Sequence, residues 1–124
     1  DKSLAIAADV DRRAIKSTIE IIQNDEDLFN IFNNVLPAGT LLKNIAKNLN
    51  LGVIEIEVGA QNEGMLAAIT KIISKKGINI RQAYAEDNEL EENPILTVIT
   101  ENPIDNDLIS EFLKIKGVNR VSIY

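Results

Sequence analysis

The hydrophobic positions of residues 51–124 follow first a strand period and then a helix period. Residues 53–58, VIEIEV, alternate apolar and acidic side chains, which is the period-two pattern of a half-buried strand, with isoleucines on one side and glutamates on the other. From 65 to 73, Met, Leu and Ile recur at helical spacing. The residues Lys-Lys-Gly at 75–77 favour a helix end, because cations suit the last turn and glycine follows it.

Two further strands follow this helix. Residues 78–85 predict a second strand, and the β-branched run ILTVIT at 95–100 predicts a third. The acidic stretch 86–93 lies between them and turns the chain. We therefore expect these two strands to form a hairpin.

The last quarter of the chain predicts a second helix and a last strand. Pro103 ends the third strand, Asp105 is a plausible helix cap, and apolar residues form a helical stripe over 108–115. Residues 118–124 then supply a short strand. The order β-α-β-β-α-β predicts an α+β, ferredoxin-like sandwich in which an antiparallel sheet carries both helices on one face.

The first fifty residues predict only helices. Residues 3–8 indicate a short helix, 9–11 a turn, and 12–22 a longer helix. Two helices around a tight turn resemble a DNA-binding helix-turn-helix, and Arg12, Arg13 and Lys16 would lie at the start of its recognition helix. Because no helix precedes this pair in the sequence, we expect at most a partial helix-turn-helix.

The same basic residues have a plainer interpretation. An acidic run, Asp25-Glu26-Asp27, follows at once, and charges on helices usually face solvent. Two more helices are predicted over 28–35 and 40–49, and the apolar face of the second could pack on the sheet or on a partner subunit. The expected division is a helical segment, 1–50, and an α+β domain, 51–124.

Composition excludes several classes of chemistry. The chain has no cysteine and no histidine, which removes disulfides, thiolate nucleophiles, imidazole bases and Cys/His zinc sites. The hairpin carboxylates lack the ligand spacing of a calcium loop, and neither a phosphate-binding loop nor a dinucleotide fingerprint occurs. We therefore expect a protein that is not an enzyme and uses no cofactor or metal.

Charge and hydropathy limit the partners. The net charge is −6, with six Lys/Arg against seven Asp/Glu in residues 1–50 and seven against twelve in residues 51–124. Any DNA contact therefore belongs to the first fifty residues, since phosphate backbones are bound by local basic surface. No apolar run approaches the roughly 20 residues that span a bilayer, and the first residues do not form an export signal, so we expect a cytoplasmic protein without a membrane partner.

Residues 53–84 resemble the first half of an ACT domain, a module that binds amino acids and similar effectors in metabolic regulators. The most telling parts are Asn-Glu-Gly-Met-Leu at 62–66 and Gly-Ile-Asn-Ile at 77–80. With its first fifty residues, the chain is similar to archaeal ACT proteins described as predicted regulators of amino-acid metabolism. The resemblance implies ligand-binding residues Gln61, Asn62, Glu63, Gly64, Met65, Leu66, Asn79 and Ile80.

The turn before the first α+β helix is chemically suited to a carboxylate. The first N–H groups of a helix have no intrahelical partner and carry the positive end of the dipole, and Gly64 leaves room for close approach. In serine-binding relatives, Asn stands at the places of Asn79 and Gln61. Many amino-acid-binding members have Pro where this chain has Glu63, and a carboxylate there would disfavour an acidic ligand.

Structural roles are the alternative for these residues: Gly64 permits the turn, Asn62 caps the helix, and Asn79 lies on a polar strand. The exposed sheet face and edges, and the habit of related modules, predict at least a homodimer with the effector at its interface. The sequence thus favours an allosteric, metabolite-binding regulator. A DNA-binding regulator and a ligand-free module that docks on a metabolic enzyme stay open as alternatives.

Overall fold

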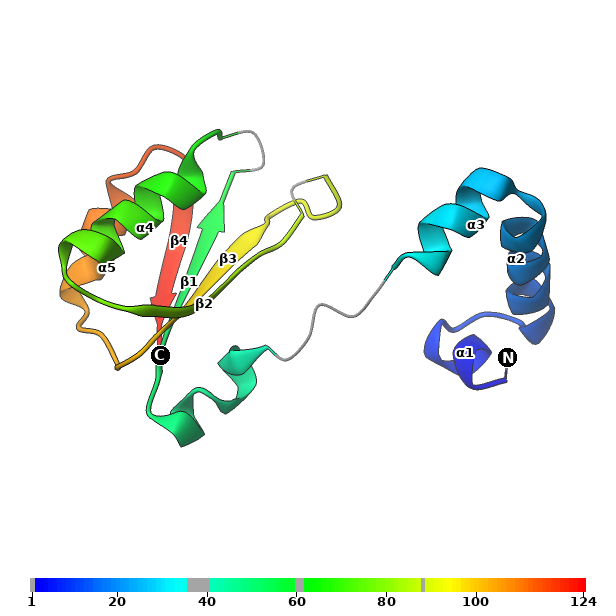
Figure 1. Ribbon diagram of the computed structural model, residues 1–124, viewed down its shortest axis with the longest axis horizontal. Helices are drawn as coiled ribbons and strands as arrows, with labels where there is room; N and C mark the ends of the chain where they lie inside the picture. The colour runs from blue at the N-terminus through cyan, green and yellow to red at the C-terminus, as the bar shows by residue number, and fades with distance from the viewer. Residues whose placement is uncertain (1, 36–40, 60–61, 88) are drawn as a thin grey trace. The chain divides into compact units, whose positions relative to one another are not determined.

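The computed structural model describes residues 2–35, 41–59, 62–87 and 89–124. The chain divides into two compact units, Asp1–Gly39 and Thr40–Tyr124, and each is described by itself (Figure 1). The predicted boundary at Leu51 falls later than this division, because residues 41–51 belong with the sheet that follows them.

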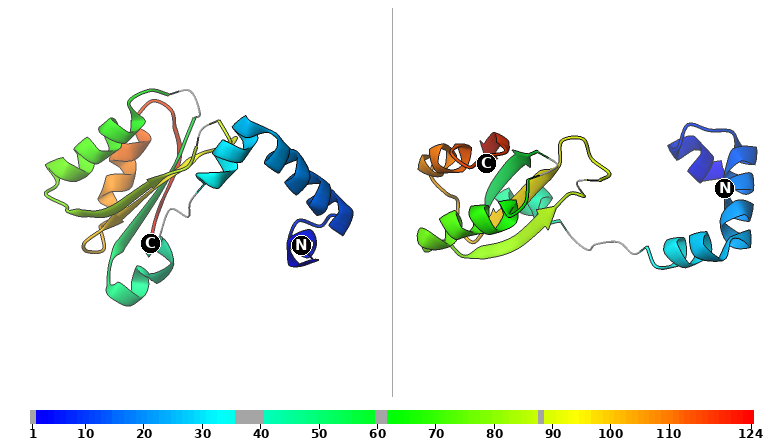
Figure 2. Two further views of the ribbon diagram at one scale, coloured as in Figure 1. Left: turned by 45° about the vertical axis from the view of Figure 1, so that its right-hand side comes forward. Right: turned by 90° about the horizontal axis from the view of Figure 1, so that it is seen from above.

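The first unit is a short chain of three helices, α1 (Lys2–Ala7), α2 (Arg12–Asn24) and α3 (Glu26–Asn33) (Figure 2). Aspartates start the second and third helices: the Asp11 carboxylate accepts a hydrogen bond from the Arg13 N–H at 2.6 Å, and Asp25 accepts one from Leu28 at 2.9 Å. Such caps satisfy N–H groups that a helix leaves free. The predicted short helix, turn and longer helix are all present.

The first unit buries little of its apolar surface. Among residues 2–35 only Ala5 is buried, and large apolar side chains stay exposed, including Ile21, Phe29, Ile31 and Phe32. The apolar faces of α2 and α3 are therefore largely open within this unit.

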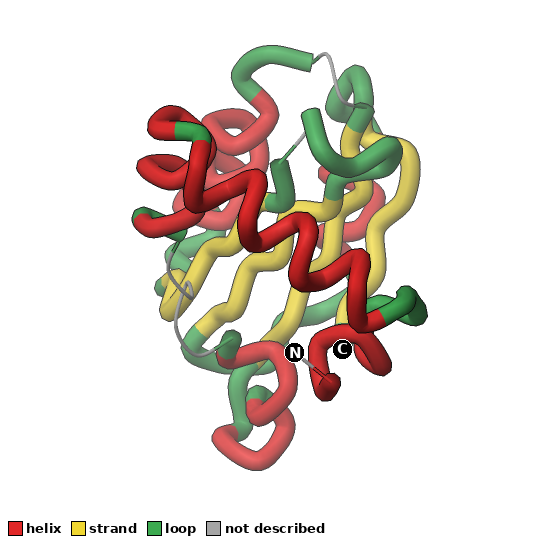
Figure 3. Tube along the Cα trace, turned by 90° about the vertical axis from the view of Figure 1, so that its right-hand side faces the viewer, coloured by secondary structure: helices red, strands yellow, loops and turns green. Residues whose placement is uncertain are grey.

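The second unit is built on one antiparallel sheet of four strands. The strands are β1 (Gly52–Val58), β2 (Ile80–Ala85), β3 (Ile95–Thr100) and β4 (Val118–Ile123), in the order β2-β3-β1-β4 (Figures 1 and 3). The strands β1 and β3 lie inside the sheet, and β2 and β4 form its edges. The β2–β3 pair is the predicted hairpin.

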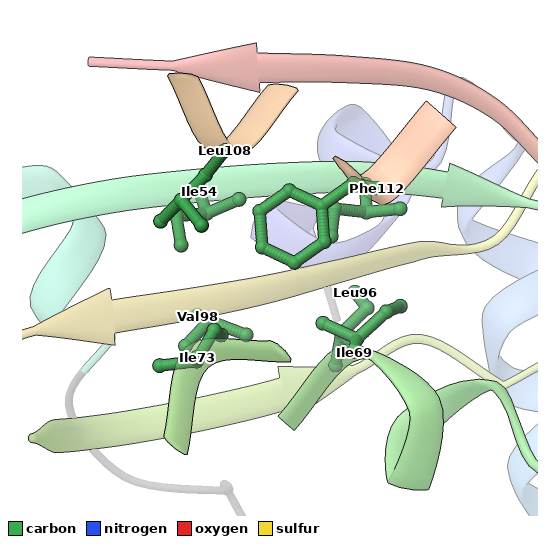
Figure 4. Packing of buried hydrophobic residues seen from close by; sticks show 8 residues of the cluster. Ile54, Ile69, Ile73, Leu96, Val98, Leu108 and Phe112 are labelled. Atoms are coloured by element: carbon green, nitrogen blue, oxygen red, sulfur yellow. The ribbon is translucent and has the colours of Figure 1, made fainter. Parts of the chain in front are cut away.

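Both helices of this unit cover the same face of the sheet. The helices α4 (Met65–Lys75) and α5 (Asp107–Leu113) separate the strands in the predicted β-α-β-β-α-β order. Their buried residues pack on the even-numbered side of β1 and β3, as Figure 4 shows for side chains of α4 and α5 that point toward the strands. The core consists of Ile54, Ile56, Ile69, Ile73, Leu96, Val98, Leu108 and Phe112. The fold is therefore α+β and ferredoxin-like.

The start of α5 corrects one prediction. The residue that caps this helix is Asn106 rather than Asp105, and no cap hydrogen bond comes from its side chain. The backbone carbonyl of Asp105 instead accepts a bond from the Leu108 N–H at 3.5 Å, which makes a tight turn ahead of the helix.

The predicted helix over 40–49 is wrong, and Thr40 lies outside the described residues. Two 3₁₀ turns stand there, η1 (Leu42–Ile45) and η2 (Lys47–Leu49), and Asn50 ends them in the left-handed conformation. The segment is fixed from outside: the Leu42 N–H bonds the side-chain oxygen of Gln82 at 2.9 Å, and Ala46 packs with Leu51, Val53 and Ile99. This second, smaller core covers part of the sheet face opposite α4 and α5.

Candidate functional site

The turn before α4 has the features that a carboxylate needs. Gly64 is the N-cap residue, with φ of 73°, and α4 begins at Met65. Among the described residues no side chain caps the first turn, and no atom lies within 4 Å of the place where a Cβ on Gly64 would stand. The free N–H groups of this turn therefore have open space beside them.

The predicted residues around Gly64 lie mostly at the surface. Asn62, Glu63 and Leu66 are exposed and Met65 is half-buried, while Gln61 lies outside the described residues. These side chains belong to one turn, so the structure brings Asn62 to Leu66 together as one short surface segment.

Asn62 has a structural role different from helix capping. Its side-chain amide donates to the Gly59 carbonyl at 3.3 Å, and a Cβ on Gly117 would overlap it. The Gly59 N–H also bonds the Gly117 carbonyl at 2.9 Å. Asn62 thus joins the end of β1 to the turn before β4, and the interpretation of Asn62 as the cap of α4 is wrong.

Asn79 lies just before β2 in a separate hollow. Its amide donates to the Glu101 carboxylate at 3.0 Å, and the Glu101 N–H bonds the Asn79 carbonyl at 3.0 Å. The hollow has a volume of about 290 Å³ and is also lined by Gly77 and Pro103. Ile80, by contrast, packs against the core under the helices.

The Gly64 turn and Asn79 stand at opposite ends of the sheet. Asn79 precedes Ile80, which pairs with Thr100, the last residue of β3. The Gly64 turn follows β1, whose last residue, Val58, bonds through its N–H to the Pro94 carbonyl just before β3 begins. Five steps of about 3.3 Å along β3 put roughly 17 Å between the two ends. An amino acid is too short to touch both within one chain.

The other predicted contacts lie in the first unit. Arg12, Arg13 and Lys16 are exposed on the first turns of α2, after the tight turn in which Asp9 takes a left-handed conformation. The structure therefore keeps the basic residues together at the start of α2, after the turn that separates it from α1.

A second hollow was missed by sequence reasoning. It lies in the second unit on the sheet face opposite α4 and α5, and has a volume of about 650 Å³. We call it the Lys47 hollow; residues that line it include Lys47, Asn50, Leu51, Val53, Pro103 and Tyr124. The segment 42–49 was predicted as a helix, so nothing in the sequence indicated that its lysines lie beside β1.

One ion pair forms the edge of the Lys47 hollow. The ammonium of Lys43 lies 2.9 Å from the Glu55 carboxylate, whose side chain is only 13% exposed. This hydrogen bond to Glu55 is the largest cause of a pKa of Lys43 raised above its ordinary value. The bond also ties the η1 segment to the middle of β1.

Metal and membrane chemistry find no support in the described parts of the chain. Within these residues, no cluster of three or more acidic side chains is placed to hold a metal ion. No described helix is both long and apolar enough to cross a membrane.

Comparisons with known proteins find similar folds. No protein-family model and no curated protein matches the chain. It is similar to the crystal and solution NMR structures of the ACT domain from GTP pyrophosphokinase of Chlorobium tepidum, at 24% and 25% identity and TM-scores of 0.47 and 0.45. Both similarities cover 60% of this chain, and 96% and 84% of those chains respectively.

A third similar structure extends over nearly the whole sequence. The crystal structure of PH0061 is 17% identical, with a TM-score of 0.34, and the similarity covers 97% of this chain and 75% of that chain.

Proposed function

We propose that this protein is a regulator of amino-acid metabolism whose residues 51–124 form an ACT-type domain that binds an amino acid. The observation that carries the proposal is the open N-terminal turn of α4 at Gly64. The resemblance of residues 53–84 to ACT sequences supports the class of ligand. The role is binding rather than catalysis, and the protein acts in the cytoplasm without a cofactor.

In this proposal the carboxylate of the ligand accepts hydrogen bonds from the free N–H groups that follow Gly64. The helix dipole adds to the attraction, since its positive end lies at the same place. The absence of a side chain at Gly64 lets the carboxylate approach the backbone closely.

Asn79 completes the site from a second chain. Its amide carries both donor and acceptor atoms, which suit the amino and carboxylate groups of an amino acid. Because the Gly64 turn and Asn79 lie at opposite ends of β3, a strand about 17 Å long, the ligand joins two chains. The active form is therefore a homodimer or a larger homo-oligomer with its effectors at the interface.

Glu63 restricts the choice of effector. Its exposed carboxylate lies next to Gly64, where it repels a second carboxylate on the ligand. Neutral and basic amino acids should therefore bind in preference to aspartate and glutamate. Binding at the interface would favour one arrangement of the dimer and so couple the metabolite level to an output.

Thermal unfolding of the full chain with each of the twenty amino acids tests the proposal. A ligand at 100 times its dissociation constant stabilises a fold by about 2.7 kcal/mol, which gives a clear rise in the unfolding midpoint. The rise should vanish in Asn79→Ala and persist in Asn48→Ala, which removes an exposed amide outside both parts of the site. If no amino acid raises the midpoint, or if the two variants behave alike, the proposal fails.

DNA binding is a second candidate, favoured by the exposed Arg12, Arg13 and Lys16 at the start of α2. Retention of the full chain on DNA should fall steeply with salt, because each phosphate contact releases counterions. Changing the three basic residues to Ala should abolish retention, whereas Lys114→Ala with Lys116→Ala, two exposed lysines in the other unit, should not. Equal retention of both variants would exclude this candidate.

A further inference from the structure

The Lys47 hollow has the size and the floor of a small-molecule site. Its volume of about 650 Å³ lies within the range of roughly 300–1,000 Å³ typical of such sites. Leu51 and Val53 are buried beside it, and Pro103 adds to its apolar lining. This floor is held firmly, because Leu51 and Val53 belong to the second core with Ala46.

An aromatic ring forms one side of the hollow. The Tyr124 backbone is paired with Val53 through two hydrogen bonds, of 2.9 and 3.4 Å, yet the residue as a whole is 69% exposed. A backbone so fixed beside the floor presents the ring to whatever enters the hollow. Stacked or edge-to-face contact with another ring stabilises such an arrangement beyond the burial of apolar area alone.

The charges of the hollow select an anion. Lys43 is paired with Glu55, but Lys47 makes no ion pair with any described residue, so the side chains that line the hollow carry a net charge of +1. By contrast, residues 40–124 together hold nine Lys/Arg against twelve Asp/Glu, a net charge of −3. The Lys47 hollow therefore has a positive charge above an apolar floor, although the domain as a whole is acidic. The side-chain amides of Asn44 and Asn50 line the same hollow and offer further donors.

We infer that the Lys47 hollow binds a small aromatic anion, whose ring lies against Tyr124 and the Val53 floor while its anionic group pairs with Lys47. This site is distinct from the proposed amino-acid site: Pro103 lines both this hollow and the one beside Asn79, but of the two hollows only this one is lined by Lys47 and Tyr124. Its ligand would add a link between the η1–η2 segment and the sheet, beside the Lys43–Glu55 pair and the Leu42–Gln82 bond.

The test is a titration of the full, ¹⁵N-labelled chain with indole-3-acetate, followed by two-dimensional NMR. The amide signals of Asn50, Val53 and Tyr124 should shift together and saturate. Cyclohexylacetate, which carries the same charge without an aromatic ring, should bind more weakly because it loses the contact with Tyr124.

The decisive variant reverses the charge of Lys47, the lysine of the hollow that has no ion-pair partner among the described residues. Lys47→Glu should raise the dissociation constant of indole-3-acetate by about tenfold or more, since an attraction becomes a repulsion. Lys71→Glu makes the same change at an exposed position on α4 and should leave it unaltered. Lys47 is exposed in the structure, so the folded spectrum should survive either change.

Two results would overturn the inference. One is saturable binding whose shifts fall elsewhere, on α2 and α3 or at the Gly64 turn, with no change at Val53 and Tyr124. The other is an equal loss of affinity in the Lys47 and Lys71 variants. Asn79→Ala should keep indole-3-acetate binding intact, so failure of this site and failure of the amino-acid site give different results.

Discussion

Gly64 shows how a single residue sets the geometry of the proposed site. Its φ of 73° belongs to the left-handed region, which glycine adopts without cost and other residues do not. The chain can then leave β1, reverse and enter α4 with the first helical N–H groups uncovered. The role in turn formation and the role in binding are compatible, because both require that no side chain stands at this position.

Replacing Gly64 by alanine should lower the free energy of unfolding by about 1 kcal/mol, the usual cost of the left-handed conformation for a residue with a Cβ. Asparagine tolerates this conformation better, so Gly64→Asn should lose clearly less. Urea unfolding of the two variants measures the difference. The conformational account would be contradicted if both lost the same amount, since no described atom lies within 4 Å of a Cβ at this position.

The Lys43–Glu55 pair makes stability depend on pH in one direction. Glu55 raises the pKa of Lys43 above its ordinary value of 10.5, so the stabilisation is fully present below that value and is lost as pH rises through the raised pKa. The Lys43 side chain is 45% exposed, and an exposed pair contributes about 0.5 kcal/mol. In urea unfolding, wild type and Glu55→Gln should therefore differ at about pH 9, below the ordinary pKa of lysine, and converge as the pH rises through the raised pKa of Lys43. A difference that grows with pH would refute the assignment.

At the scale of elements, local pattern predicted most of the second unit. The run ILTVIT gave β3 at 95–100 with both ends correct, because β-branched residues and flanking prolines mark a strand clearly. The 3₁₀ turns at 42–49 could not be predicted in the same way. Their form depends on contacts with Gln82 and Glu55, far along the sequence, and these contacts outweigh the helical spacing of the apolar residues.

For the proposed amino-acid site, the sequence predicted the separate segments but not their arrangement in space. The residues 62–66 form one turn because they are neighbours in sequence, and that much a local pattern reveals. The distance between this turn and Asn79 follows from the register of β2 on β3, which no short segment encodes. The Lys47 hollow depends on the same kind of long-range contact, between η1 and β1.

Shortening a side chain to alanine should affect stability very differently on the two faces of α5. Phe112 is fully buried under the helices, and Phe112→Ala should lower the free energy of unfolding by about 3–5 kcal/mol, because a large cavity opens in the core. Its neighbour Leu113 is 49% exposed, and Leu113→Ala should cost less than about 1 kcal/mol. Thermal unfolding of the two variants compares the positions. Similar losses would mean that α5 does not pack as described.

At the scale of the whole molecule, the two units differ in how much core they hold. Both hydrophobic clusters, with Ile54 and Phe112 in one and Ala46 and Ile99 in the other, lie within Thr40–Tyr124. The described part of the first unit buries Ala5 alone. Among the described residues, the buried apolar side chains that stabilise the fold therefore lie almost entirely in the second unit.

A chain of residues 41–124 should consequently fold without the first unit. It should keep the circular dichroism of an antiparallel sheet with helices and unfold in one cooperative transition, as expected for a small domain with its own core. A matched chain that carries Phe112→Ala should unfold at a clearly lower temperature. A broad, non-cooperative transition of the unaltered 41–124 chain would show that its core is insufficient.

The central claim is that an amino acid binds between the Gly64 turn of one chain and Asn79 of another, and mixed dimers test it most directly. Gly64→Asp, which sets a carboxylate beside the ligand's own, and Asn79→Ala should each abolish binding alone. After the two are unfolded together and refolded in equal amounts, calorimetry with the effector should recover about one quarter of the wild-type sites, because half of the dimers then hold one intact site of two. If mixed dimers recover no binding, either both residues belong to one site within the same chain or neither belongs to the site. Both cases would contradict an effector bound between two chains.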